Sequence, residues 1–425
     1  MFFRQAWVTI AVVVTLVGIG TREPAVAAMG ILILLTGGLA RAWNRFALER
    51  LEYRRTLASR RAFVGEELDV TFSLTNRKAL PLPWIDVQDN VPEAMPAPGV
   101  HTSPSGFSGL VSVTRTTSLA WYQRVAWQTR FQCTSRGYFR FGPAMLRSGD
   151  PFGFFSTSGE RSRQDHVTVL PRLYDLAALG LPTRRPFGEE RGGSPIFEDP
   201  SRLVGIRDYR AGDPLKRIEW KATARRGVLQ SRVYEPSSSL YLLVALNVTT
   251  LEHVWEGYDP VRLERSISLA GSVSRWAHDH RYATGLIANS SYPGADRAMS
   301  IPAGRDPDQL TRILEALAMV SPLTIAPLEE VLEEAARRLP LGATIVLVAS
   351  YCHESLAATL QRLQLKGYPL AILWTADTEP PPPLAGLNVF DLAPRMRELE
   401  RDHDHDTSFA RPAEAETATP AIERA

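Results

Sequence analysis

Seven arginine and lysine residues lie between Leu203 and Gly227, with acidic residues among them. Guanidinium groups hold phosphates and carboxylates through paired hydrogen bonds, so this cluster could bind an anionic ligand. Acidic residues are mixed among the cations, and charges of both signs often satisfy each other within one structural network. Both interpretations remain open from the sequence. The cations are Arg207, Arg210, Lys216, Arg217, Lys221, Arg225 and Arg226, and the acidic residues are Asp208, Asp213 and Glu219.

The other reactive residues do not form a recognised catalytic motif. Cys352, His353 and Glu354 follow a predicted strand and could supply a nucleophile or an acid–base pair, although a lone cysteine is more often a small buried hydrophobe. The run 402–406 alternates Asp and His but lies in a polar tail, where a solubilising role fits better than metal binding. The sequence has no phosphate-binding Gly-x-x-x-x-Gly-Lys-Ser/Thr loop, no His-Glu-x-x-His and no Gly-x-Ser-x-Gly. We therefore predict no catalytic residue and no cofactor.

Local signals predict the element that carries the basic cluster. Asp213 is a good N-cap, Pro214 suits the first helical position, and Gly227 is a plausible C-terminal stop. They predict a helix over residues 214–226, with one face formed by Leu215, Ile218 and Ala222.

Hydrophobic patterns divide the rest of the chain. Short alternating runs punctuated by Gly and Pro predict an all-β sandwich domain. Later, continuous apolar runs alternate with helical patterns, which predicts an α/β domain with a mostly parallel sheet. The predicted segments are a β-sandwich at 51–175, a linker at 176–200, the basic segment and α/β domain at 201–398, and a disordered acidic tail at 399–425.

The first 50 residues predict a transmembrane helical hairpin. Two apolar runs, 6–20 and 25–40, are joined by a polar turn, and each is slightly shorter than the ~20 residues that span a bilayer. Seven arginines between Arg41 and Arg61 follow the second run, which places both chain ends in the cytoplasm by the positive-inside rule. Residues 6–40 would then contact membrane lipid. A signal peptide cleaved at 25–27 and a buried soluble hairpin are the alternatives.

Composition sets further limits. The chain has 425 residues, more than one ordinary core accommodates, so several domains are expected. Its net charge of +2 gives no reason to expect nucleic acid as a partner. The two cysteines, Cys133 and Cys352, form neither a disulfide framework nor a four-cysteine zinc site.

The basic segment resembles the signature of the bacterial domain-of-unknown-function family 58. The block from Arg136 to Pro143 and the run from Asp150 to Phe155 also resemble the stretch that precedes this signature in such proteins. The resemblance implies two membrane spans, a β-rich part and a domain like the von Willebrand factor A domain. It also implies that the protein functions together with a MoxR-type AAA ATPase. The matching positions are Arg207, Tyr209, Gly212, Asp213, Arg217, Ile218, Trp220, Lys221, Thr223, Ala224 and Arg225.

A von Willebrand factor A domain commonly holds a metal-ion-dependent adhesion site, Asp-x-Ser-x-Ser, after its first buried strand. The matching stretch here begins with Asn247 and Thr249 and ends in Leu251, and Ser350 stands where a later Asp is common. Magnesium prefers hard oxygen ligands that include a carboxylate. We therefore expect a degenerate site that binds no metal.

Three functions remain open. The first is a non-enzymatic, membrane-anchored assembly protein whose α/β domain binds a protein partner, such as a MoxR-type AAA ATPase. The second is an enzyme or anionic-ligand-binding protein at the inner face of the membrane, using the cluster from Arg207 to Arg226. The third is an envelope scaffold whose working surface is the β-sandwich.

Overall fold

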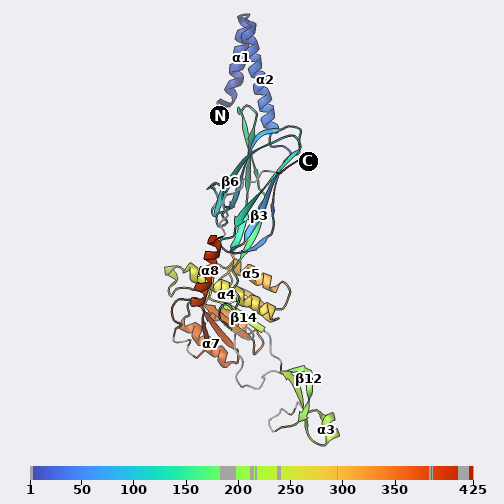
Figure 1. Cartoon of the computed structure of the whole chain (residues 1–425), viewed down its shortest axis with the longest axis vertical. Helices are drawn as coiled ribbons and strands as arrows, with labels where there is room; N and C mark the ends of the chain where they lie inside the picture. The colour runs from blue at the N-terminus through green and yellow to red at the C-terminus, as the bar shows by residue number, and fades with distance from the viewer. Residues whose placement is uncertain are drawn as a thin grey trace. The chain divides into compact units, whose positions relative to one another are not determined.

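The computed structural model describes residues 3–181, 198–210, 215, 218–236, 241–293, 295–381, 384, 386–409 and 421–424. The chain forms two compact units, residues 1–170 with 412–425, and residues 171–411. Figure 1 draws the whole chain, coloured from blue at the N-terminus to red at the C-terminus.

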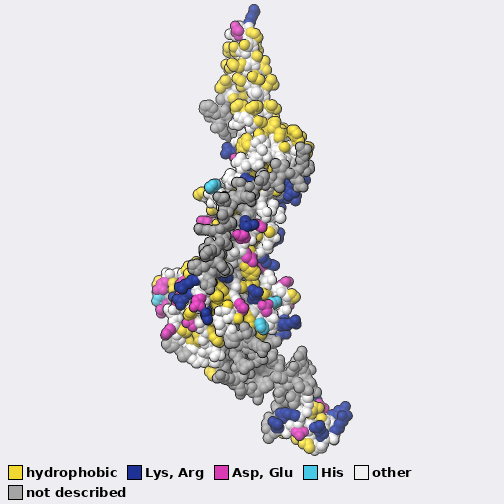
Figure 2. Space-filling model, in the orientation of Figure 1, with side chains coloured by type: hydrophobic (Ala, Val, Ile, Leu, Met, Phe, Trp, Pro, Cys, Tyr) yellow, Lys and Arg dark blue, Asp and Glu magenta, His cyan; other side chains and the backbone are white. Residues whose placement is uncertain are grey.

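The first unit begins with two antiparallel apolar helices, α1 (Phe3–Gly20) and α2 (Pro24–Phe46). Among the described residues, α2 is long and apolar enough to cross a membrane, whereas the apolar part of α1, Trp7–Gly20, is shorter. Glycines allow the two helices to approach closely, because a Cβ added at Gly30 would lie 2.7 Å from the backbone nitrogen of Thr15. Figure 2 shows that apolar side chains dominate the visible surface of this pair.

A β-rich body follows the helices. One antiparallel sheet has the strand order β1-β3-β7-β20, a second has the order β10-β9-β4-β6-β5, and a small mixed sheet has the order β2-β11-β8. Buried side chains from all three sheets form one core, including Phe72, Ile85, Phe131, Leu146 and Val167. The strands are β1 (Leu51–Leu57), β2 (Arg61–Phe63), β3 (Glu67–Asn76), β4 (Leu82–Pro92), β5 (Thr102–Pro104), β6 (Leu110–Leu119), β7 (Gln123–Gln132), β8 (Gly137–Phe141), β9 (Ala144–Gly149), β10 (Ser156–Arg161), β11 (Asp165–Leu170) and β20 (Ala421–Arg424).

The second unit is built on a six-stranded sheet with the order β16-β15-β14-β17-β18-β19. All neighbouring strands are parallel except the edge strand β16, which pairs antiparallel with β15. Its elements are β14 (Tyr241–Leu246), the 3₁₀ helix η2 (Val254–Glu256), α4 (Pro260–Asp279), β15 (Ala283–Ala288), β16 (Met299–Gly304), α5 (Gln309–Ala318), α6 (Leu328–Ala336), β17 (Thr344–Ala349), α7 (Glu354–Leu365), β18 (Leu370–Trp374), β19 (Asn388–Asp391) and α8 (Ala393–Phe409).

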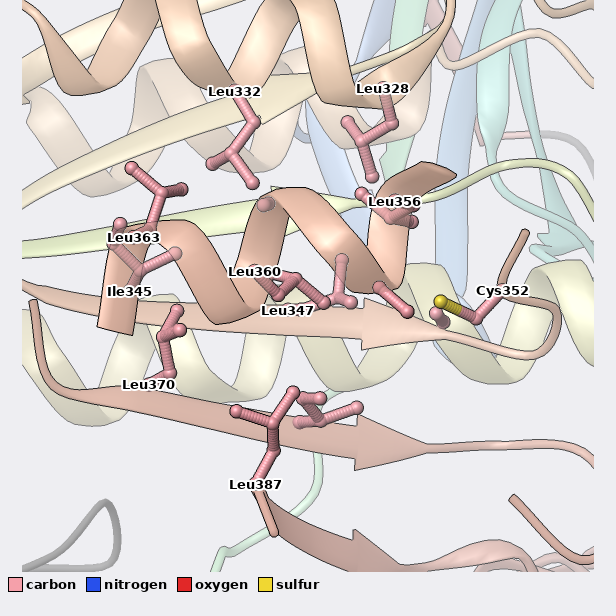
Figure 3. Close-up of a cluster of buried hydrophobic side chains, with 14 of the residues drawn as sticks. Leu328, Leu332, Ile345, Leu347, Cys352, Leu356, Leu360, Leu363, Leu370 and Leu387 are labelled. Atoms are coloured by element: carbon pink, nitrogen blue, oxygen red, sulfur yellow. The ribbon is translucent and has the colours of Figure 1, made fainter. Parts of the chain in front are cut away.

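Helices cover both faces of this sheet, which explains the continuous apolar sequence of its central strands. Figure 3 shows one side of the core, where leucines of α6 and α7 pack over β17. These are Leu328, Leu332, Leu356, Leu360 and Leu363, above Ile345 and Leu347.

An antiparallel pair, β12 (Glu198–Asp208) and β13 (Gln230–Pro236), precedes the sheet and carries the short helix α3 (Trp220–Arg226) between its strands. We call these three elements the basic arm, and they contain the described part of the arginine-rich cluster.

Three boundaries differ from the sequence predictions. The region expected as a linker from residue 176 starts with packed structure, since Leu176, Leu179 and Leu181 are buried, and its last residues belong to β12. Residues 182–197 lie outside the described residues. The expected disordered tail from residue 399 begins inside α8, where Glu400 forms an ion pair of 2.8 Å with the buried Arg265. Its last residues form β20, which pairs with β7.

The helix predicted at 214–226 begins only at Trp220. The preceding backbone pairs with β13 instead: Ile218 bridges Ser231, and the Glu219 N–H donates to the Gln230 carbonyl at 2.9 Å. This pairing holds residues 218 and 219 in extended backbone, whereas Leu215 lies in a 3₁₀ turn and its carbonyl accepts from the Ile218 N–H at 3.2 Å. The predicted cap residues Asp213 and Pro214 lie outside the described residues. The predicted stop at Gly227 is confirmed, because it adopts the left-handed conformation with φ 70°.

Candidate functional site

The carboxyl ends of β14, β15 and β17 form the first candidate site. From β14 the chain builds the sheet in one direction through β15 and β16, and later in the other through β17, β18 and β19. Ligands of open α/β sheets bind where the strand order reverses in this way, in the crevice beyond the carboxyl ends of the strands. Here that position lies between β14 and β17, next to Asn247 and Ser350.

Asn247 is the centre of a hydrogen-bond network within this edge. Its side-chain amide donates to the Tyr351 carbonyl at 2.8 Å, which ties the β14 loop to the β17 loop. Its Oδ1 accepts from the Thr249 N–H at 3.1 Å and from Nδ2 of Asn289 at 2.9 Å. Asn247 and Asn289 are both buried. The Asn247 amide therefore joins three strand ends, a structural role that a carboxylate could not fill because it has no hydrogen to donate.

Thr249 extends the network to the loop before α6. Its hydroxyl lies 3.2 Å from the Thr324 hydroxyl and accepts from Asn289 Nδ2 at 3.2 Å. The Ile325 N–H donates to the Asn289 carbonyl at 2.9 Å. Asn289 directly follows β15, so its place just after the short strand predicted at 283–288 is a sequence signal for this residue.

Asp259, in the connection between β14 and α4, serves a helix. The Asp259 side chain accepts from the N–H groups of Val261 and Arg262 at 2.9 and 3.2 Å, as an N-cap of α4, and pairs with Arg262 at 3.2 Å. Among the described residues, no three His, Cys, Asp or Glu side chains are grouped as metal ligands. The sequence-based expectation of a degenerate, metal-free site at Asn247, Thr249 and Ser350 stays a prediction.

Ser350 and Cys352 lie just after β17. Both are buried, and the Ser350 hydroxyl has no hydrogen-bond partner among the described residues. Burial, with a smaller contribution from Glu329, raises the pKa of Cys352 to about 12. A thiol with such a pKa carries almost no thiolate at neutral pH, which argues against a nucleophilic role. His353 is exposed at the start of α7, and its ring lies edge-on to Tyr351 at 4.8 Å.

Two segments at this edge of the sheet carry exposed apolar side chains. Trp255, in the 3₁₀ helix η2 between β14 and α4, is 81% exposed and stacks on His253 with ring centroids 4.1 Å apart. Leu323, next to Thr324, is 70% exposed, and Ile325 is exposed as well. We call Trp255, Leu323 and Ile325 the apolar rim. Exposed apolar groups around a network whose polar atoms are largely satisfied are typical of a protein-docking surface.

The basic arm is the second candidate site, and part of its charge is satisfied internally. Arg232 forms an ion pair with Glu219 at 2.5 Å, and Gln230 donates to Asp208 at 2.6 Å. Lys221 and Arg225 lie on the exposed helix α3 and form no ion pair with another described residue. Figure 2 shows Lys and Arg side chains gathered on this arm.

The predicted site residues form two sets in the structure. Asn247, Thr249 and Ser350 lie at the edge of the six-stranded sheet. The described residues of the other set belong to the basic arm, and they are Arg207, Tyr209, Trp220, Lys221 and Arg225. Trp220 is exposed, so it does not anchor α3 within the described part of the arm. Gly212, Asp213 and Arg217 lie outside the described residues. The described arginines of the arm do not converge around one cavity. Their arrangement therefore gives no support to the anionic-ligand interpretation.

Residues 205–405 match the model of the family described as "Protein of unknown function DUF58". The matched region begins in β12 and ends in α8, so it contains the basic arm and the six-stranded sheet. A relative, "Uncharacterized protein YeaD" of Bacillus subtilis (strain 168), is 25% identical over 203 residues. That alignment covers 47% of this chain and 48% of the relative, so the chain spans about half the length of the curated relative it matches.

Solved structures are only distantly similar. The CARDB domain of the PF1109 protein from Pyrococcus furiosus is 12% identical, with a TM-score of 0.20 over 28% of this chain and 87% of that domain. A cohesin module from Clostridium perfringens is 9% identical, with a TM-score of 0.18 over 28% of this chain and 96% of the module. These scores are too low to support a functional argument.

Proposed function

We propose that this protein is a non-enzymatic, membrane-anchored interaction protein. In this proposal α1 and α2 form a two-span hairpin in the bacterial inner membrane, and the rest of the chain lies in the cytoplasm. The length and apolar surface of α2, the close packing of α1 against it and the arginines that follow α2 support the anchor.

The six-stranded unit would be a von Willebrand factor A-like domain that has lost its metal site. Its strand order, with a reversal between β14 and β17 and one antiparallel edge strand, supports this assignment. Asn247 at the first strand end supports the loss of metal binding, since its amide donates a hydrogen bond that an aspartate could not make.

The apolar rim carries the proposal of a protein partner. Trp255 is 81% exposed and Leu323 70% exposed, each in a connecting segment beside a polar network whose atoms mostly bond each other. Tryptophan is enriched among the residues that dominate binding energy at protein interfaces. Following the family resemblance, the proposed partner is a MoxR-type AAA ATPase, which would supply the nucleotide-binding loop that this sequence lacks.

The experiment is a crosslinked pull-down of the tagged, full-length protein from membranes, with and without ATP, read by mass spectrometry. We compare the wild type with Trp255→Ser and Leu323→Ser. Leu365→Ser is the matched control, because Leu365 is 89% exposed but ends α7, which runs from the carboxyl edge of the sheet toward its amino edge.

The proposal expects one ATPase whose recovery depends on nucleotide, falls at least about tenfold in the two rim variants and is unchanged in the control. A tenfold loss corresponds to about 1.4 kcal/mol of binding free energy, a modest effect for an interface aromatic residue. Equal recovery with all three variants would reject the rim as the docking surface. Recovery of no ATPase would favour an envelope scaffold instead.

A further inference from the structure

Two loops of the β-rich body expose aromatic side chains that no role assigned above explains. The loop between β6 and β7 carries Trp121, which is 67% exposed, and Tyr122. The loop between β9 and β10 carries Phe152 and Phe154, which are 55% and 63% exposed. The rings of Phe152 and Phe154 stack with their centroids 5.8 Å apart. Exposed aromatic groups on two separate loops indicate a shared contact surface.

The strand register places both loops at the same end of the body. Leu82 at the start of β4 pairs with Leu119 at the end of β6, and Ile85 pairs with Ser148 near the end of β9. The Tyr122 N–H donates to the carbonyl of Lys78 at 3.3 Å. The Lys78 ammonium in turn bonds carbonyl groups just after α2. The loops therefore lie at the end of the body where α2 enters it.

The loop between β9 and β10 also touches the helices directly. The ring of Phe155 lies edge-on to that of Trp7 in α1, with centroids 6.0 Å apart. The guanidinium carbon of Arg41 in α2 lies 6.0 Å from the centre of the same ring. Tryptophan and arginine at the ends of spanning helices mark the membrane–water interface. Phe152 and Phe154 are therefore held close to the level of these two markers.

Hydrogen bonds fix the shape of this loop. The buried carboxylate of Asp150 accepts from the N–H groups of Phe152, Phe154 and Phe155 at 2.8, 3.3 and 2.5 Å. Gly153 adopts φ 76°, a left-handed conformation that favours glycine. Because the loop is already ordered, its two exposed rings can be buried with little loss of conformational entropy.

The geometry points to a second membrane contact: the β6–β7 and β9–β10 loops place Trp121, Tyr122, Phe152 and Phe154 in the headgroup layer around α2. This inference rests on the membrane anchoring proposed above. The bilayer is the occupant because these loops adjoin the ends of the apolar helices, and because Trp, Tyr and Phe rings are favoured at the interface. The contact would fix the orientation of the β-rich body relative to the membrane.

The test measures membrane depth at single sites in the full-length protein, reconstituted in nanodiscs of phosphatidylcholine and phosphatidylglycerol. Cysteine replaces Trp121, Phe152, Leu35 or Phe107 in separate variants, and each is labelled with a nitroxide. Leu35 lies on the exposed surface of α2 and reports the anchor itself. Phe107 is an exposed aromatic residue near the opposite end of the body, where Leu110 pairs with Pro92.

The parent chain serves as the labelling blank. Its two cysteines, Cys133 and Cys352, are buried, and burial raises their pKa to about 11 and about 12, so they react slowly at neutral pH. Depth is read from the relative accessibility of each nitroxide to oxygen, which concentrates in lipid, and to a water-soluble nickel chelate.

We expect labels at 121 and 152 to be shielded from the nickel chelate and accessible to oxygen at headgroup depth. The label at 35 should report the acyl region, and that at 107 bulk water. If 35 reports lipid while 121 and 152 match 107, the loop contact is rejected and the anchor stands. If 35 reports water, the anchor is rejected, and the loop contact with it.

Discussion

The ammonium group of Lys78 donates a hydrogen bond to the carbonyl oxygen of Glu49 at 2.7 Å, just beyond the end of α2. It also donates to the Ala47 carbonyl. Carbonyl groups at a helix C-terminus lack partners within the helix, and a cation there complements the helix dipole. The connection between the apolar helices and the β-rich body is therefore an ordered joint with a buried charge.

This joint predicts a pH dependence. Burial lowers the pKa of Lys78 from 10.5 to about 8, with Glu49 acting in the opposite direction. Below pH 8 the amine is charged in both the folded and the unfolded chain, so the cost of burying the charge is fully present. Between pH 8 and 10.5 the folded chain releases the proton first, so the contribution of this group to stability rises with pH.

We expect the apparent Tm of the wild type to improve relative to Lys78→Met between about pH 7 and about pH 9.5, measured by scanning fluorimetry in one detergent. Arg77→Met removes an exposed neighbouring cation and controls for net charge. A difference between wild type and Lys78→Met that stays constant with pH would refute the shifted pKa.

A buried charge cluster in the β-rich body predicts a large effect of one substitution. Arg55 Nε lies 2.9 Å from Asp89 Oδ2, which also accepts from the Tyr53 hydroxyl at 2.6 Å, and both charged side chains are almost completely buried. Burial raises the pKa of Asp89, and the Arg55 charge opposes this. Asp89→Ala leaves the buried Arg55 charge without this partner, which costs about 3–5 kcal/mol.

Urea unfolding followed by tryptophan fluorescence measures the loss. Asp69→Ala is the matched control, because Asp69 pairs with Arg130 at the surface, where such a pair contributes below about 1 kcal/mol. Combining Asp89→Ala with Arg55→Met should recover part of the stability by removing the unpaired charge. Similar small losses for both aspartates would contradict the importance of the buried pair.

The sequence predicts the sheet of the second unit well for a physical reason. Its central strands are buried on both faces, so they appear as continuous apolar runs bounded by polar residues, and β14, β15, β17 and β18 lie within one residue of the strands that the sequence predicts at 240–246, 283–288, 344–349 and 370–374. Helices α4 and α7 follow from their apolar periodicity in the same way. The edge strands β16 and β19 are less buried, lack this signal and were not predicted.

The errors arise where distant residues decide the local structure. Asp213 and Pro214 are strong helix-start signals, yet Ile218 pairs with Ser231 and helix α3 begins only at Trp220. Acidic composition predicts disorder after residue 399, but the Glu400 carboxylate pairs with Arg265 on α4. The candidate edge was found through Asn247, whereas its apolar rim was missed because single exposed side chains have no sequence signature.

The hydrogen bonds at this edge of the sheet predict that replacing Asn247 by aspartate, the usual metal ligand at this position, destabilises the protein. Asn247→Asp loses the donor to the Tyr351 carbonyl and places a charge at a buried position. In metal-free buffer we expect a loss of about 1–3 kcal/mol by chemical unfolding. Asn388→Asp, at an exposed strand residue, is the control and should be nearly neutral.

The same edge predicts the result of a magnesium titration. Wild-type protein titrated calorimetrically with magnesium should show no micromolar binding, because no carboxylate replaces Asn247. Micromolar binding would refute the metal-free assignment.

The packing of α1 against α2 predicts opposite results for two nearby glycines. A Cβ at Gly30 would lie 2.2 Å from the Thr15 hydroxyl and 2.7 Å from its backbone nitrogen, so Gly30→Ala must push the helices apart. At Gly38 nothing lies within 4 Å of that position, so the same substitution in the same helix is a matched control for helix propensity. Overpacking at Gly30 should cost about 1–3 kcal/mol and lower the apparent Tm in detergent, whereas Gly38→Ala leaves it unchanged or higher. Equal behaviour of the two variants would mean that α1 and α2 do not pack closely in the membrane-anchored protein, and the hairpin would have to be abandoned in favour of independent helices.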